Sequence, residues 1–180
     1  MEQIKQGKKL AEMGKMAEAM IKFKSAQALD AHLVTFDIKA KTKYFAAQSL
    51  VEQSEKLAKE GKIKLAIAKY QSAQQIDDNL KISAWQWNEL CWQGSLYGQA
   101  AKVLKFCEQA VVLAPNNWSI RDSQALVKAL TGDIQAAIKD FQFVIEESND
   151  EELKKIRQSW VAALKQGKNP FTEKVLKGLR

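Results

Sequence analysis

The stretch that decides the fold is Ser83–Pro115, which reads SAWQWNELCWQGSLYGQAAKVLKFCEQAVVLAP. Its apolar residues recur at steps of three and four, the spacing of one face of an α-helix. One such face lies on each side of a break at Gly94–Gly98, and the closing proline stands where a helix has to end. The pattern predicts two antiparallel helices. The expected packing faces are Trp87, Leu90, Cys91 and Gly94 on the first helix, and Val103, Phe106, Cys107 and Ala110 on the second.

An internal repeat supports a chain built from such pairs. KKLAEMGKMAEAMIKFKSAQALD (8–30) aligns without a gap on EKLAKEGKIKLAIAKYQSAQQID (55–77). A glycine lets the chain leave a helix in the left-handed conformation, and alanines let two helices approach closely. Because one repeat alone cannot bury its apolar face, the duplication predicts a solenoid. The matched positions are Gly14 and Gly61, Ala19 and Ala66, Phe23 and Tyr70, Ala26 and Ala73, and Asp30 and Asp77.

The Ser83–Pro115 unit resembles a tetratricopeptide (TPR) repeat. It has large residues on its first helix, small ones where the helices cross, and an alanine and an aromatic residue on its second helix. The resemblance implies an all-α fold, a TPR-like right-handed α-solenoid of about four helix-pair repeats. It also implies a long helix between repeats and a C-terminal capping helix. The expected units are approximately 2–30, 37–78, 83–115 and 118–148, with a capping segment 150–180, in a single domain over 1–180.

Two features of this organisation depart from a plain TPR array. The repeat period exceeds the roughly 34 residues of a TPR, and the excess lies in 31–54. One continuous helix is expected there to about Lys59, with Tyr44, Phe45, Leu50 and Val51 buried. At the other end, Thr172 is expected to cap a short final helix. Phe171, in the turn before this helix, is expected to fold back against the stack together with Val175 and Leu179.

Nearly the whole chain is also similar to the carboxy-terminal region of bacterial, chiefly cyanobacterial, multidomain signalling proteins. The similarity is carried by WNELCWQGSLYG (87–98), IRDSQALVKALTGD (120–133) and RQSWVAALKQGKNPFT (157–172). In that family such regions follow WD40 propellers, NTPase switch modules or caspase-like domains and act as interaction or sensing arms. The resemblance therefore implies an interaction module. The sequence contains no segment of those neighbouring domains, so their activities are not carried over.

The composition narrows the class of protein. A chain with 46% hydrophobic residues, 8 Gly and 2 Pro is globular rather than disordered. It has neither the apolar core of a signal peptide nor an apolar run of membrane length, so a soluble, cytoplasmic protein is expected. Cys91 and Cys107 are interpreted as small buried core residues in a reducing compartment, although a disulfide between facing helices is geometrically possible. His32 is the only histidine, no zinc spacing exists, and no metal or cofactor is expected.

No catalytic motif is present. The sequence lacks a Gly-rich phosphate loop, a nucleophile elbow and a His-containing triad. Acidic pairs such as Asp77-Asp78 and Glu146-Glu147 fall at expected helix ends, where solvated charges are common. We therefore expect that the protein is not an enzyme.

The net charge of +7 is unevenly spread: +5 over 1–82, zero over 83–116, −3 over 117–150 and +5 over 151–180. A positive field attracts acidic partners or nucleic acid without specificity, but a solvated Lys-rich helical surface has the same composition. No RNA- or DNA-binding motif is present, and Arg is rare beside Lys. Nucleic-acid (RNA) binding through basic helical surfaces is therefore the alternative hypothesis.

The leading hypothesis is a scaffold or adaptor that holds a peptide or protein, acidic by charge, in a concave groove lined by first-helix side chains. Trp85, Asn88 and Trp92 lie three and four residues apart, away from the packing face. A tryptophan stripe of this kind is either core, covered here by the long preceding helix, or an interface. Asn88 in such a groove is able to grip a ligand backbone with two hydrogen bonds.

Other candidates lie on the next first helix. Arg121 and Asp122 are more typical of a structural ion pair than of a site, and Lys128 follows two turns later. Chaperone-tail binding is not expected, because Ala84 rather than lysine precedes Asn88 by four residues. Self-association is a further hypothesis, in which the basic carboxy end meets the acidic 146–152 segment of a neighbour. The candidate partner contacts are Trp85, Asn88, Trp92, Arg121 and Lys128.

Overall fold

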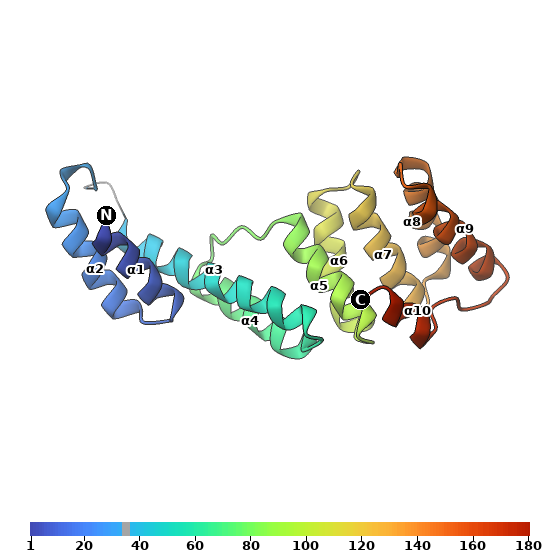
Figure 1. Ribbon diagram of the computed structural model, residues 1–180, viewed down its shortest axis with the longest axis horizontal. Helices are drawn as coiled ribbons and strands as arrows, with labels where there is room; N and C mark the ends of the chain where they lie inside the picture. Colours follow the sequence, from blue (N-terminus) through green and yellow to red (C-terminus); the bar gives the residue numbers. More distant parts are fainter. Residues whose placement is uncertain (34–36) are drawn as a thin grey trace. The chain divides into compact units, whose positions relative to one another are not determined.

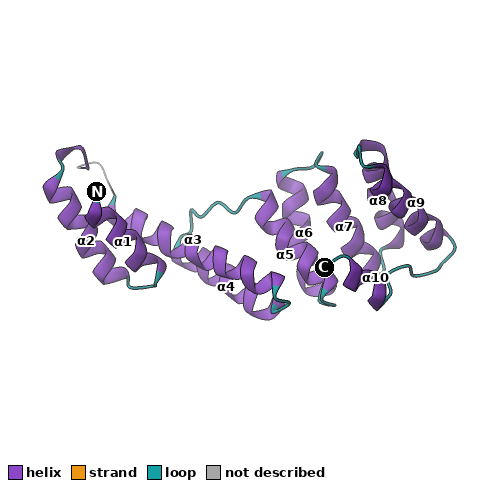
Figure 2. Ribbon diagram, in the orientation of Figure 1, coloured by secondary structure: helices purple, strands orange, loops and turns teal. Residues whose placement is uncertain are grey.

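The predicted helical segments are helices in the computed structural model, which describes residues 1–33 and 37–180. Within these residues every regular element is an α-helix or a short 3-10 helix, and Figure 2 shows them joined by loops. The all-α prediction is therefore confirmed. By packing, the chain falls into two units, one of residues 1–57 and 64–81 and one of residues 58–63 and 82–180.

The first unit holds the amino-terminal helices (Figure 1). They are α1 (Glu2–Glu12), α2 (Met16–Leu29), the 3-10 helix η1 (Ala31–Leu33), most of α3 (Ile38–Lys59) and most of α4 (Ile63–Ile76). The long helix predicted to reach about Lys59 is α3; residues 34–36 before it lie outside the described part of the chain. The hydroxyl of Ser54 on α3 donates a hydrogen bond of 2.8 Å to the carbonyl oxygen of Ala66 on α4, which shows these two helices in contact.

The core of the first unit is built from the repeat positions. Ala19, Phe23 and their repeat counterparts Ala66 and Tyr70 are all buried, as predicted. Tyr44, in contrast, was expected in the core but is 43% exposed. The neighbouring Phe45 packs against the core instead. The ring of Tyr44 lies edge-on against that of Phe45, with centroids 5.5 Å apart.

The second unit begins with the α5–α6 pair. It comprises α5 (Ala84–Leu96), α6 (Ala100–Leu113), α7 (Trp118–Thr131), α8 (Ile134–Glu147), α9 (Glu151–Lys165) and α10 (Glu173–Gly178), with residues 58–63. Each of α5 to α8 packs against the next helix, and α5 also packs against α7. Both predicted packing faces of the pair are buried. The rings of Trp87 and Phe106 stack between α5 and α6, with centroids 5.4 Å apart.

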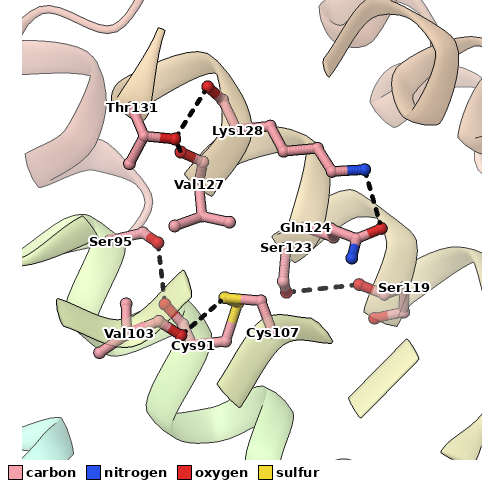
Figure 3. The surroundings of a disulfide bond; sticks show 10 residues. All are labelled: Cys91, Ser95, Val103, Cys107, Ser119, Ser123, Gln124, Val127, Lys128 and Thr131. Atoms are coloured by element: carbon pink, nitrogen blue, oxygen red, sulfur yellow. Dashed lines mark hydrogen bonds between the residues drawn. A yellow bond between two sulfur atoms is a disulfide. The ribbon is translucent and has the colours of Figure 1, made fainter. Parts of the chain in front are cut away.

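The two cysteines form a disulfide, which corrects their interpretation as separate core thiols. Cys91 of α5 and Cys107 of α6 face each other with Cα atoms 5.0 Å apart, and both are buried. Close packing of the α5–α6 pair brings the cysteines within the Cα separation that a disulfide requires. Figure 3 shows the bond beside Ser119, Ser123 and Val127 of α7. It therefore fixes α5 to α6 at the point where α7 packs on them.

The chain end folds back on the second unit, as predicted. Phe171 is buried with Trp160 and Phe141, and Val175 and Leu179 of α10 pack against the same core cluster. Thr172 caps α10 by accepting a hydrogen bond from the Val175 amide. Arg180 donates a hydrogen bond of 2.8 Å to the carbonyl oxygen of Leu96, so this terminal charge is not free.

A matched pair of glycines in the second unit tests this packing. Gly61 and Gly98 both have a left-handed φ, +74° and +69°, so a side chain at either costs about 1–2 kcal/mol of backbone strain. A Cβ at Gly61 would also lie 2.5 Å from the ring of Tyr97, whereas one at Gly98 meets nothing within 4 Å. Tyr97 donates a hydrogen bond of 3.1 Å to the Lys59 carbonyl beside it.

We therefore expect Gly61→Ala to lower the free energy of unfolding more than Gly98→Ala does. The extra loss comes from the displaced Tyr97 ring and its hydrogen bond, which is worth about 1 kcal/mol. Urea denaturation followed by circular dichroism measures both variants. Equal losses would mean that the Tyr97 contact does not hold this turn.

Candidate functional site

A cavity of about 260 Å³ opens among α5, α7 and α9 of the second unit. These are the first helices of successive pairs, the elements that were expected to line a groove. Below, we call this cavity the α5–α7–α9 cavity. Its lining residues are Asn88, Glu89 and Trp92 from α5, Trp118, Ser119, Asp122 and Ser123 from α7, and Leu153 and Arg157 from α9.

Local sequence explains why each helix presents these side chains. On α5 Asn88 and Trp92 are four residues apart, and the same spacing recurs on α7 and α9, so each helix supplies residues from successive turns of one face. Side-chain caps set where the helices begin. Ser83 and Gln86 form a capping box at α5, and Asn117 accepts hydrogen bonds from the Ser119 and Ile120 amides at α7. Asp150 caps α9 in the same way.

Three described residues have a buried side-chain polar atom without a hydrogen-bond partner, Gln3, Asn88 and Arg121, and of these Asn88 lines the cavity. Only 9% of its surface is exposed, and its Oδ1 atom is buried without a hydrogen-bond partner among the described residues. A buried acceptor without a partner costs about 1–3 kcal/mol, which is why such groups are rare. A lining residue of the cavity thus carries a hydrogen-bond acceptor that no other described residue uses.

One wall is a buried ion pair. Arg157 Nε donates a hydrogen bond of 2.9 Å to Asp122 Oδ1, and Nη2 donates a second one to Asp122 Oδ2. The two side chains are only 6% and 8% exposed, and the guanidinium lies 4.2 Å from the centroid of the Trp160 ring. The pair joins α9 to α7. It leaves this wall without net charge, so Arg157 is already occupied and unavailable to an acidic ligand.

The rim carries a carboxylate that is held less firmly. Glu89 accepts a hydrogen bond of 3.1 Å from Gln93 Nε2. Its other neighbour is Lys59 Nζ at 3.9 Å, on a side chain that is 63% exposed. An exposed pair at this distance contributes little stability, because water and salt screen it. Glu89 is therefore the charge of the cavity that is open to a ligand.

The predicted tryptophan stripe is divided between two environments. Trp92 is partly buried, packs against the core cluster and lines the cavity together with Asn88. Trp85 lies in the first turn of α5, is 55% exposed and is not among the lining residues. As a partner contact, Trp85 stays a prediction.

Arg121 and Lys128, also predicted as partner contacts, both bind Asp140. Each cation is 2.6 Å from a carboxylate oxygen of this residue on α8, which is 2% exposed. Lys128 also donates a hydrogen bond of 3.2 Å to Gln124 (Figure 3). These ion pairs join α7 to α8, and neither cation lines the cavity. A role for them in partner binding stays a prediction.

Several lining residues were not identified from the sequence. Trp118, Ser119 and Arg157 line the cavity, and so does Glu89. The available signal was the spacing: Trp118 opens the helix capped by Asn117, and Arg157 stands four residues after Leu153. Arg157 was not matched with Asp122 because the two are separated by 35 residues.

Across residues 1–33 and 37–180, no three His, Cys, Asp or Glu side chains are placed so that they could hold a metal ion. None of the helices in that part of the chain is long and apolar enough to cross a membrane.

The buried ion pair makes a quantitative prediction. Asp122→Asn removes one partner and leaves the Arg157 charge buried, which should cost about 3–5 kcal/mol of the free energy of unfolding. The double variant Asp122→Asn/Arg157→Met should lose less than the sum of the two single variants, because no charge is stranded. As a control, Glu152→Gln in the exposed Glu152–Lys155 pair should cost less than about 1 kcal/mol. Comparable losses for Asp122→Asn and Glu152→Gln would contradict the buried pair.

The sequence matches no family model, and a search of curated proteins finds no match. Among solved structures, the chain is similar to the TPR domain of P58(IPK), with a TM-score of 0.61 and 16% sequence identity. The likeness covers 92% of this chain and 46% of that one, so the chain spans about half the length of this structural neighbour. At this identity the comparison shows the fold alone. It agrees with the element order and helix pairing described above: the fold is an all-α, TPR-like helical repeat.

Proposed function

We propose that the protein is a non-catalytic interaction scaffold that binds a segment of a partner protein in the α5–α7–α9 cavity. The observation that carries the proposal is Asn88, which lines the cavity and whose buried Oδ1 has no hydrogen-bond partner among the described residues. A stable fold retains such a group at a cost, and a ligand that hydrogen-bonds to it recovers that cost. The TPR-like fold is compatible with this role but does not by itself assign it.

The chemistry of the cavity suits a peptide. A carboxamide offers both a donor and an acceptor, which match the C=O and N–H groups of an extended backbone. Trp92 and Trp118 supply apolar surface beside it, and tryptophan is enriched among residues that dominate binding energy. The lining includes no histidine or cysteine, and the Ser123 hydroxyl is directed at the Ser119 carbonyl oxygen, 3.4 Å away. These lining residues support binding rather than nucleophilic chemistry as the proposed role.

Three finer features stay predictions. They are a role in signalling as an arm of a larger protein, self-association through the basic carboxy end, and a cytoplasmic location. The disulfide between Cys91 and Cys107 weighs against the location, because disulfides are more typical of oxidising compartments.

The Asn88→Leu variant tests whether this residue is kept for binding. Leucine has nearly the same shape and needs no hydrogen bond, so the free protein should gain about 1 kcal/mol of unfolding free energy. The midpoint of thermal unfolding should rise by about 2–4 °C, measured by circular dichroism. A variant that is less stable than the wild type would show that Asn88 serves the fold.

The partner is identified by photo-crosslinking from inside and outside the cavity. A photoreactive amino acid replaces Ser119 in the cavity wall or, as a control, Lys139 on the exposed side of α8. In nuclease-treated lysate, a discrete protein adduct should form from position 119, not from position 139, and should vanish when Asn88→Leu is added. Equal adducts from both positions would refute the cavity as the site, and an adduct lost only with nuclease would favour nucleic-acid binding.

A further inference from the structure

We propose that the α5–α7–α9 cavity selects a basic side chain, arginine or lysine, of the bound peptide. The inference rests on the proposed function and names the ligand chemistry of the same site. It reverses the expectation, drawn from the net charge of +7, that the partner is acidic.

Two lining residues present acceptor oxygens that a cation could contact. Among the described residues, Asn88 Oδ1 has no hydrogen-bond donor, and the ion-pair partner of the Glu89 carboxylate is the exposed Lys59 at 3.9 Å. Ammonium and guanidinium groups carry several N–H donors and no acceptor, so they match both groups at once. A carboxylate ligand would instead face Oδ1 and Glu89 with further acceptors.

Charge complementarity points the same way. The formal charges of the lining are those of Glu89, Asp122 and Arg157, and the last two cancel in their bidentate pair. The cavity therefore has a net charge of −1 within a chain of +7. Breaking the Asp122–Arg157 pair to release Arg157 for an anion would strand a buried carboxylate, which costs several kcal/mol.

The aromatic walls fit the same ligand. The faces of tryptophan rings attract ammonium and guanidinium groups, and two of the five tryptophans of the chain line this cavity. Its volume of about 260 Å³ lies below the roughly 300–1,000 Å³ of pockets for drug-sized ligands. That size suits one long side chain. Lys59 already places an ammonium group near Glu89, and a ligand cation would displace it.

The test uses three peptides that differ at one position: acetyl-Ala-Ala-Arg-Ala-Ala-amide and its citrulline and glutamate analogues. Citrulline has the shape of arginine without the charge. Binding at 150 mM salt is followed by the indole N–H resonances of the ¹⁵N-labelled protein, assigned with Trp92→Phe and Trp118→Phe. The arginine peptide should shift the Trp92 and Trp118 resonances and bind about tenfold more tightly than the citrulline peptide, the factor expected for a hydrogen-bonded charge.

Matched variants locate the effect. Glu89→Gln should reduce the affinity for the arginine peptide about tenfold and leave that for the citrulline peptide unchanged. Glu108→Gln, an exposed glutamate on α6 outside the cavity, should change neither, and Lys59→Met should strengthen arginine binding. Circular dichroism confirms that each variant is folded.

Three outcomes would overturn the inference: equal binding of the arginine and citrulline peptides, tighter binding of the glutamate peptide, or no shift with any peptide at millimolar concentration. Its failure is separable from that of the proposed function. An adduct from position 119 that needs Asn88, together with no preference for arginine, would contradict this inference but not the proposed function. Arginine binding without such an adduct would contradict the proposed scaffold function.

Discussion

The buried pair between Asp122 and Arg157 determines both the shape and the charge of the candidate site. It joins α9 to α7 by two hydrogen bonds in a water-poor setting, so the third wall of the cavity is fixed by a contact between residues far apart in sequence. The same pair cancels a carboxylate and a guanidinium inside the wall. Because this pair is neutral and fully bonded, the groups left to contact a ligand include the Asn88 acceptor and the Glu89 carboxylate.

The helix that bears these two groups is held from its other side. Cys91 lies between Asn88 and Trp92 in the sequence, but it faces α6, where it is bonded to Cys107. Trp87 stacks on Phe106 on that same face. With one face of α5 tied to α6 and another lining the cavity, the helix that carries these side chains is fixed before a ligand binds, which lowers the entropy lost on binding.

The fold was predictable from the sequence because burial in a helical pair is periodic. The duplicated positions Ala19, Phe23, Ala66 and Tyr70 stand at fixed steps, and all are buried. The site was only partly predictable, because it depends on which turn of α5 faces α7 and α9, and periodicity does not give the position of one helix along another. Trp85 and Trp92 lie on the same face of α5 two turns apart, yet only Trp92 reaches α7 and α9. Periodicity also misplaced Tyr44, since it does not show which of two adjacent aromatics enters the core. Periodicity also did not decide whether Cys91 and Cys107 form a disulfide, because that depends on how α5 and α6 are aligned along their axes.

Selection of a basic side chain accounts for two features of the cavity, the unpartnered Asn88 oxygen and the weakly paired Glu89 carboxylate. A chain of net charge +7 repels cationic ligands at long range, so a cationic group can be held only by contacts at short range. Those contacts require acceptors that keep hydrogen-bonding capacity in the free protein, because an acceptor fully bonded within the fold gains little from a ligand. Asn88 Oδ1 has no partner among the described residues, and Glu89, at the rim, accepts one hydrogen bond from Gln93 and is only weakly paired with Lys59. The local loss of stability at Asn88 and the weak pairing of Glu89 are then two consequences of one selective site, because both groups stay open to the same kind of donor.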